Sequence, residues 1–298
     1  MLRSRRLELG VAALACLVGA GVALGVPGPA SEPGAPRLSP STAREAKRAP
    51  DSEPIPRPQS RRRRAAPAWR PRTAAARAYA RRRGGSVTFS VRRGQRDWSF
   101  RGRAPARSAS TVKAMLLAAY LSAPAVRRRA LSAGEATTLS AMITRSDNDA
   151  ATSIHGSVGS AGLTAIARRA GMRDFAASPA WGVSRLTAAD GARLMLRFER
   201  LVPRRHRVRA LALLAQIVPE QRWGIADAAP RGWQLHFKGG WDVASAGAPA
   251  VNHQIALLRR GRRRVAIAVL TSGDADQAHS SETLRGVAAR LLRGLGAR

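Results

Sequence analysis

Residues 252–271 read Asn-His-Gln-Ile-Ala-Leu-Leu-Arg-Arg-Gly-Arg-Arg-Arg-Val-Ala-Ile-Ala-Val-Leu-Thr, and this stretch decides what kind of sheet the chain can form. Two strand-like runs, Asn252 to Leu258 and Arg264 to Thr271, flank a short basic segment with Gly261 at its centre. Apolar runs joined by a short segment that contains Gly are typical of a β-hairpin. The C-terminal part of the chain therefore contains antiparallel strands.

Terminal helices are predicted on both sides of these strands. After the hairpin, apolar residues recur with helical spacing at Leu284, Val287, Ala288, Leu291, Leu292 and Leu295. At the other end, Thr73 to Arg83 is rich in Ala and favours a helix, and Ser86 to Val91 alternates like a strand. The segment from Ser110 to about Val218 is mostly helical in character. We predict an α+β fold: an antiparallel sheet flanked by terminal helices, with a mostly helical second subdomain, within residues 73–298.

The first 72 residues have a different composition. Residues 1–26 combine a basic start with a nearly uncharged run from Leu9 to Val26, which predicts a signal peptide or a membrane anchor and hence an exported protein, secreted or anchored, that acts outside the cytoplasm. Cys16, the only cysteine, lies in this run, whose continuation argues against lipidation. Residues 27–72 are rich in Pro, Ala, Ser and Arg and predict a disordered linker.

The basic character of this linker suggests a partner. Between Arg57 and Arg83 there are eleven Arg and no acidic residue, so the linker could contact an anionic membrane surface or serve as a solvated spacer. We expect no nucleic-acid partner, because a membrane segment precedes the linker, and we expect the domain to be a monomer.

The lysines are the most informative residues for chemistry. The chain has three lysines among 52 basic residues, and two of them, Lys113 and Lys238, lie in short motifs. Arg stays protonated, whereas a partly buried Lys can act as a base. In Ser110-Thr111-Val112-Lys113, a spacing of three residues at the start of an apolar helix, Thr111 to Leu121, places the hydroxyl and the amine on one face. This is the arrangement of a nucleophile beside its base.

Two further motifs follow along the chain. In Ser146-Asp147-Asn148, residues two apart in an extended loop point the same way, so Ser146 and Asn148 can face a cleft while Asp147 holds the loop. Lys238-Gly239-Gly240-Trp241 follows the alternating run Trp233 to Phe237 and is expected on a strand, where glycines let a ligand approach the backbone. Each motif alone is weak evidence.

The order Ser-x-x-Lys, Ser-Asp-Asn and Lys-Gly-Gly is the pattern of penicillin-recognising serine enzymes. Residues from about 75 to 298 resemble the class A β-lactamase family, with a β-lactamase/transpeptidase-like fold. The resemblance implies that Ser110 is the nucleophile, that Lys113 is its base, and that Ser146 passes a proton to the leaving nitrogen. It further implies substrate binding by the following residues: Asn148, Lys238, Gly239, Gly240 and Trp241. The substrate would be a β-lactam or a peptidoglycan-stem-like amide.

The sequence departs from this family at three places. The segment Arg173 to Asp190, where class A β-lactamases carry a deacylating Glu, contains no Glu and has acids only at Asp174 and Asp190. Gly239 stands where the family usually has Thr or Ser. Only 36 positions separate Ser110 from Ser146, so the helical subdomain is trimmed. We therefore expect an acyl-enzyme that forms but is cleared slowly.

Several functions are compatible with these observations. The first is a serine acyl-hydrolase whose deacylating base lies elsewhere, with Glu220 or a water held by Lys113 as candidates. The second is a peptidoglycan-directed penicillin-binding protein, similar to a D-Ala-D-Ala peptidase, that releases its acyl group slowly. The third is a non-catalytic wall-associated binding module. The fourth is a basic membrane-tethered binding protein whose motifs are coincidental.

Cofactor and metal sites are not expected. The five His residues are scattered without metal-ligand spacing or a Cys partner, and His253, near the third motif, is the one to examine. The Gly-rich run from Gly156 to Gly162 lacks the spacing of a nucleotide-binding motif and is expected to form a loop between helices. Arg222, beside Trp223, is a candidate for a second carboxylate-binding charge.

Overall fold

The structure, a computed structural model, describes residues 68–244 and 247–296. The predicted signal or anchor segment, Cys16 and the linker as far as residue 67 lie outside the described residues. No helix in the described part is both long enough and apolar enough to span a membrane.

A five-stranded antiparallel sheet forms the centre of the described domain. Its strand order is β2-β1-β7-β6-β5. The bounds are β1 Ser86–Arg93, β2 Arg96–Phe100, β5 Gln234–Asp242, β6 Val251–Arg260 and β7 Arg263–Ser272. The hairpin predicted from residues 252–271 is the β6–β7 pair, in which Ile255 lies opposite Ala268. Strand β5 pairs with β6 alone, so it is an edge of the sheet.

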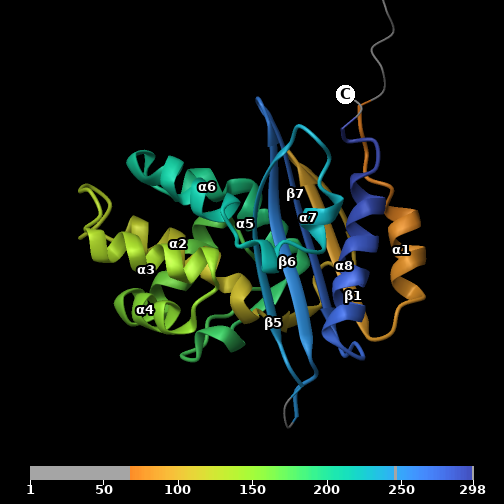
Figure 1. The fold of residues 1–298 in the computed structure, drawn as a ribbon, viewed down its shortest axis with the longest axis horizontal. Helices are drawn as coiled ribbons and strands as arrows, with labels where there is room; N and C mark the ends of the chain where they lie inside the picture. The colour runs from red at the N-terminus through yellow and green to blue at the C-terminus, as the bar shows by residue number, and fades with distance from the viewer. Residues whose placement is uncertain (1–67, 245–246, 297–298) are drawn as a thin grey trace, which may run out of the picture. The chain divides into compact units, whose positions relative to one another are not determined.

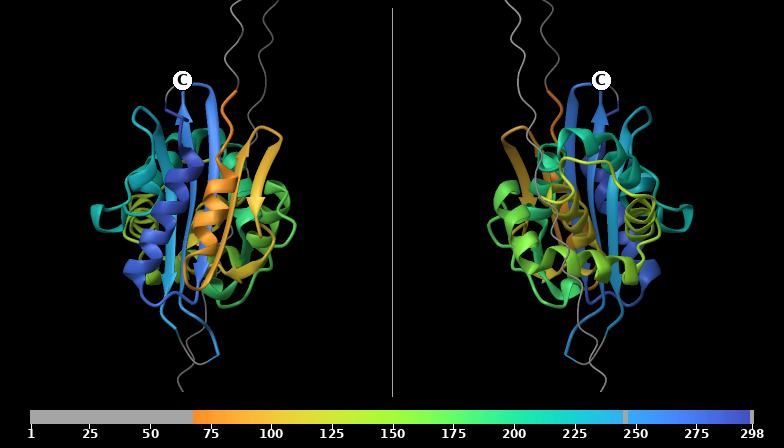
Figure 2. Two further views of the ribbon diagram at one scale, coloured as in Figure 1. Left: turned by 90° about the vertical axis from the view of Figure 1, so that its right-hand side faces the viewer. Right: turned by 90° about the vertical axis from the view of Figure 1, so that its left-hand side faces the viewer.

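Helices cover both faces of this sheet (Figure 1). The terminal helices α1 (Thr73–Arg81) and α8 (Gln277–Leu292) pack together on one face, with the short α7 (Ile225–Ala228) against α8 (Figure 2). On the other face lie α2 (Lys113–Ser122), α3 (Ala133–Thr144), α4 (Asn148–Ala170), α5 (Ala188–Leu201) and α6 (Arg207–Ala215). The predicted α+β architecture, with terminal helices on a sheet and a helical subdomain, is confirmed.

Short elements connect these layers. Strands β3 (Pro105–Arg107) and β4 (Arg185–Thr187) form a separate antiparallel pair. Four 3₁₀ turns complete the chain: η1 Ala109–Val112, η2 Trp181–Val183, η3 Arg204–His206 and η4 Pro219–Gln221. The apolar helix predicted to start at Thr111 thus begins as a 3₁₀ turn and becomes α-helical at Lys113.

Helix α5 lies directly on the sheet because its contact residue is a glycine. A Cβ atom at Gly191 would lie 2.7 Å from Cγ2 of Ile255, which no side chain tolerates without displacement. The N-terminus of α5 is capped by Thr187, whose hydroxyl accepts a hydrogen bond from the amide of Asp190. The close approach fixes the distance between the sheet and the helical subdomain.

Two local expectations differ from the structure. The run from Gly156 to Gly162 is shorter than a loop: two helical segments of α4 meet there at a kink at one non-helical residue, Gly159, with φ 62°. The packed domain also begins before Thr73. Trp69 is only 8% exposed, and its indole N–H donates to the carbonyl of Arg293 at 3.0 Å.

Candidate functional site

Three segments from different layers meet at the edge strand β5. The 3₁₀ turn η1 carries Ser110, the junction of α3 and α4 carries Ser146 and Asn148, and β5 carries Lys238 and Gly240. Turn η1 contacts both β5 and η2. The structure therefore brings the three sequence motifs into one region between the sheet and the helical subdomain.

Lys113 lies at the centre of this region. Its side chain is fully buried, and its Nζ donates to the carbonyl of Ser146 at 2.6 Å, to the hydroxyl of Ser146 at 3.3 Å and to Oδ1 of Asn148 at 2.7 Å. Burial lowers the pKa of Lys113 to about 8, while the charge of Asp147 acts in the opposite direction. An amine with this pKa can exchange a proton near neutral pH.

Ser110 is the partly exposed member of the group. Its side chain has intermediate exposure, and its hydroxyl makes no hydrogen bond with the described residues. It follows Ala109, a non-glycine residue with φ 43°, at the start of the turn. Strained backbone of this kind is found at functional sites more often than elsewhere. The hydroxyl is thus open to a ligand, three residues before the buried amine.

The loop before α4 is held rigidly. Asp147 is the N-cap of α4, and its side chain accepts from the amide of Ala150 at 2.8 Å. Ser146 has φ 61°, an unusual value for a non-glycine residue. The flanking backbone is bound by Gln221, whose amide donates to the carbonyl of Arg145 at 2.9 Å. These contacts turn Ser146 and Asn148 toward the same amine.

Strand β5 lies so close to η1 that residue 240 must be glycine. A Cβ atom at Gly240 would lie 2.6 Å from the backbone nitrogens of Ser110 and Thr111. Residues alternate along a strand, so Lys238 and Gly240 share a face. Lys238 is completely buried on it, with Nζ donating to the carbonyl of Gly239 at 2.9 Å.

The two buried amines influence each other. Burial, and then the positive charge of Lys113, lower the pKa of Lys238 to about 7. Neither amine forms a salt bridge with a described residue, and the charge of Asp147 offsets only part of the cost of burying Lys113. At neutral pH the two groups therefore share less than two positive charges.

An indole ring lies over Lys113. The Nζ of Lys113 is 4.9 Å from the centroid of the Trp181 ring, and the Trp181 indole N–H donates to the hydroxyl of Thr152 at 3.3 Å. Trp181 belongs to the acid-free segment between Arg173 and Asp190. From the sequence, Trp181 is grouped with Trp223, Trp233 and Trp241 near the late half of the site, and core packing is its expected role. A contact with Lys113 was not predicted.

The acids near this segment are engaged elsewhere. Asp190 is buried, accepts from the amides of Arg173 and Asp174, and pairs with Arg193 at 2.6 Å. Asp174 pairs with Arg103 at 2.6 Å, and this contact lowers its pKa. Glu220 is exposed in η4. None of these carboxylates forms a bond with Lys113.

His253 contacts the backbone that precedes turn η1. It is fully buried, its Nε2 lies 2.9 Å from the carbonyl of Arg107, and its Nδ1 accepts from the amide of Thr271. Burial lowers its pKa to about 4, so the ring is neutral and Nε2 donates. His253 thus anchors the backbone just before η1, where Ser108 donates from its hydroxyl to the carbonyl of Gly182 at 3.3 Å.

The other face of β5 holds the aromatic residues. The ring of Trp241 packs against that of Trp223 at 5.9 Å, and a Cβ at Gly239 would meet Trp241 at an ordinary 3.7 Å. Arg222 is exposed, donates to the carbonyl of Ala215, and lies over Phe237, which neighbours Lys238 and points to the opposite face. The guanidinium of Arg222 thus contacts the end of α6 and the Phe237 ring, and its role in carboxylate binding stays a prediction.

The described residues contain no group of three or more His, Cys, Asp or Glu side chains that could bind a metal ion. The chemistry available at this site is that of a hydroxyl, two amines of low pKa, an amide and backbone N–H groups.

Comparison with solved structures identifies the fold. The fold is similar to that of a β-lactamase from Sphaerobacter thermophilus, with a TM-score of 0.64 and 21% identity over 76% of this chain and 97% of that chain. A β-lactamase from Xanthomonas campestris gives 0.61 and 20% over 75% and 97%. The class A β-lactamase of the last common ancestor of Gram-negative bacteria gives 0.62 and 19% over 75% and 99%. The fold is therefore that of a class A β-lactamase.

A family profile narrows the assignment. The profile described as the β-lactamase enzyme family matches residues 129–295, more than half of the chain. The matched range begins after Lys113 and contains the Ser146-Asp147-Asn148 and Lys238-Gly239-Gly240-Trp241 segments. The chain belongs to the β-lactamase enzyme family. A search of curated proteins finds no match to this chain.

Proposed function

We propose that the domain is an exported, monomeric serine acyl-hydrolase that forms an acyl-enzyme on Ser110 with a β-lactam or a related amide and hydrolyses it slowly. The observation that carries the proposal is the buried amine of Lys113. Its pKa is about 8, and it contacts both Ser146 and Asn148 three residues after a partly exposed Ser110. Membership of the β-lactamase enzyme family supports the same chemistry.

The acylation step uses Lys113 in its neutral form. Neutral Lys113 accepts the proton of the Ser110 hydroxyl as Oγ attacks the carbonyl carbon of the substrate. The C–N bond breaks when Lys113 returns this proton, through the hydroxyl of Ser146 at 3.3 Å, to the leaving nitrogen. An ester on Ser110 and a free amine result. Asn148 holds the substrate amide in this scheme, and Lys238 attracts its carboxylate.

Stabilisation of the oxyanion is assigned to backbone N–H groups. The amides of Ser110 and Trp241 are the proposed donors, because β5 is an edge strand that lies against η1. The contact at Gly240 supports this assignment, since it keeps β5 close to the Ser110 nitrogen. The substrate would approach the backbone of β5 at Gly239 and Gly240, and it would meet Trp241 through the backbone N–H, since the ring packs against Trp223.

Deacylation is the weak step in this scheme. A water must attack the ester, and an adjacent carboxylate would normally activate it. Here the segment between Arg173 and Asp190 contains no Glu, and it places the indole of Trp181 over Lys113. This observation favours a second function, that of a penicillin-binding protein directed at peptidoglycan-stem amides, which acylates and then holds its product. A water held by Lys113 and exposed Glu220 are the candidate bases for faster release.

The test is intact-mass spectrometry of the full chain over time with a penicillin, alongside Ser110→Ala. We expect an adduct that forms on the wild-type protein only and persists for minutes or longer. Hydrolysed drug without a lingering adduct would instead indicate a working β-lactamase with an additional base. If neither adduct nor hydrolysed drug forms, the acylation proposal is wrong and the cleft serves binding alone.

A further inference from the structure

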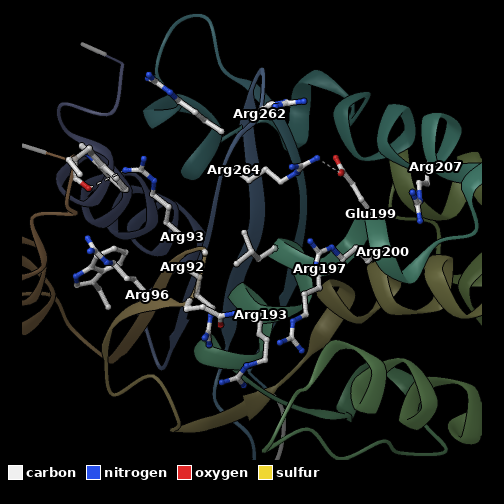
Figure 3. Close-up of a pocket in the computed structure, with 17 residues that line it drawn as sticks. Arg92, Arg93, Arg96, Arg193, Arg197, Glu199, Arg200, Arg207, Arg262 and Arg264 are labelled. Atoms are coloured by element: carbon white, nitrogen blue, oxygen red, sulfur yellow. Dashed lines mark hydrogen bonds and ion pairs between the residues drawn. The ribbon is translucent and has the colours of Figure 1, made fainter. Parts of the chain in front are cut away.

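A large cavity lined by arginine lies away from the candidate active site. Its volume is about 960 Å³, and Figure 3 shows the basic side chains that reach it from β1, β2, α5 and the β6–β7 hairpin. Its charged lining consists of ten Arg and one acid, Glu199: Arg92, Arg93, Arg96, Arg193, Arg197, Arg200, Arg207, Arg262, Arg263 and Arg264. None of the candidate catalytic residues belongs to it.

The arginines come from elements far apart in sequence, and one helix contributes three of them. Arg193, Arg197 and Arg200 follow each other at spacings of four and three on α5, so they occupy one face of that helix. Like charges at this spacing destabilise a helix. Arg92 of β1 and Arg264 of β7 bring further charge to the same hollow from the sheet. The fold thus concentrates positive charge here at a cost in stability.

Carboxylates neutralise only part of this charge. Arg92 pairs with Asp97, Arg193 with Asp190, and Arg264 with Glu199. Six arginines form no ion pair with a described residue: Arg93, Arg96, Arg197, Arg200, Arg207 and Arg262. Burial and the charges of Arg193, Arg197 and Arg173 lower the pKa of Arg92, against the effect of Asp97. The cavity therefore holds uncompensated positive charge.

The guanidinium groups of these arginines determine which class of ligand the cavity can bind. Guanidinium forks bind carboxylates and phosphates with paired, charge-assisted hydrogen bonds. One carboxylate or one orthophosphate engages one or two forks, whereas six unpaired arginines around one hollow match several adjacent anionic groups. We propose that this cavity binds a ligand that carries two or more closely spaced phosphate groups, either a soluble polyphosphate or the phosphates of lipid head groups.

The position of the cavity makes it separable from the active site. Gly240 lies opposite His253, which lies opposite Leu270, and Leu270 lies opposite Thr88. Arg92 is four residues further along β1, so strand geometry puts it about 20 Å from Gly240. The described chain also begins at this cavity, because Ala68 and Trp69 line it. A bound phosphate chain would thus lie where the basic N-terminal segment joins the domain.

Titration calorimetry of the full chain with inorganic tripolyphosphate tests the proposal. The pocket variant replaces Arg96, Arg200 and Arg262 with Gln, because these exposed side chains form no hydrogen bond, ion pair or ring contact with described residues. The control variant replaces Arg168, Arg231 and Arg285 with Gln, which are equally exposed, lie outside the cavity and change the net charge by the same amount. We expect at least a roughly tenfold loss of affinity in the pocket variant and a change below about twofold in the control.

The possible outcomes distinguish lipid phosphates from a soluble polyphosphate. They also test phosphate binding independently of the proposed acylation of Ser110. Flotation with phosphatidylglycerol vesicles that is lost in the pocket variant and displaced by tripolyphosphate identifies lipid phosphates. Vesicle binding that is unchanged while tripolyphosphate binding is lost identifies a soluble ligand. Equal losses in both variants, or orthophosphate binding as tightly as tripolyphosphate, would overturn the proposal. Acylation of Ser110 by a penicillin stays unchanged in the pocket variant, so failure of either proposal is recognisable without the other.

Discussion

Burial of Lys113 and Lys238 predicts that both amines titrate at unusually low pH. The small number of lysines in the chain makes these titrations measurable. A lysine pKa of about 8 leaves about 20% of Lys113 neutral at pH 7.4, compared with about 0.1% for an ordinary value of 10.5. This is an increase of about 250-fold in the basic form. The same calculation makes Lys238, with a pKa of about 7, about 70% neutral. Burial is the main cause at both positions, and repulsion by Lys113 adds to it at Lys238.

The assay is NMR of the full chain grown with ¹³C-labelled lysine, in which the Cε signals are followed from pH 5 to 11. Three lysines give three signals, and Lys113→Met and Lys238→Met assign two of them. We expect midpoints near 8 for Lys113 and near 7 for Lys238. In Lys113→Met the midpoint of Lys238 rises, because the repulsion is removed. Midpoints above about 9.5 for both amines would refute the reasoning and remove Lys113 as a general base.

Four further substitutions test the geometry. Gly240→Ala places a methyl group 2.6 Å from the Ser110 nitrogen, so we expect acylation to fall at least about 100-fold while circular dichroism stays native; unchanged acylation would contradict the proposed role of the strand edge. Gly239→Thr has room for its side chain, and a restored hydroxyl is expected to lower KM for carboxylate-bearing substrates severalfold; an unchanged KM argues against it. Trp181→Glu puts a carboxylate near Lys113, and we expect the adduct lifetime in intact-mass spectra to shorten; an equally persistent adduct counts against a missing base as the cause. Lys238→Met removes an amine whose pKa is lowered on folding, which destabilises the protein fully below pH 7 and not above pH 10.5. We therefore expect Lys238→Met to raise the free energy of unfolding by up to about 5 kcal/mol at pH 6 and by little at pH 10. Thermal melts would report this as a higher Tm at pH 6. An equal gain in stability at both pH values would exclude this cause.

The sequence predicted the parts of the fold that depend on local periodicity. The hairpin around Gly261 and the last helix follow from apolar spacing that stays within one element. The run around Gly159 was predicted as a loop between helices, whereas the structure has two helical segments that meet at a kink of a single residue with positive φ. Glycine marks a site of unusual backbone, but the length of the interruption depends on packing around it.

The candidate site was predictable where motifs carry the chemistry and not where the path of a loop decides. The contacts of Lys113 with Ser146 and Asn148 join residues that were already singled out by type and order. The position of Trp181 depends on how residues 173–190 cross the site, which no local pattern encodes. The arginine cavity was hidden for a different reason. Each of its residues resembles every other arginine in a chain with 52 basic residues, and only the tertiary arrangement brings them together.

The two kinds of positive residue therefore have distinct physical roles in this domain. Arginine keeps its proton even when partly buried among like charges, so the cavity at β1 and α5 stays positive at every physiological pH and can serve as a permanent anion site. Lysine responds to burial by releasing its proton more readily, so Lys113 and Lys238 are each partly neutral at physiological pH. Exchanging the types tests this directly. Lys113→Arg keeps a positive charge beside Ser146 but removes the base, so we expect acylation to fall at least about 100-fold. Acylation that survives this exchange would show that Lys113 acts through its charge and not as a base.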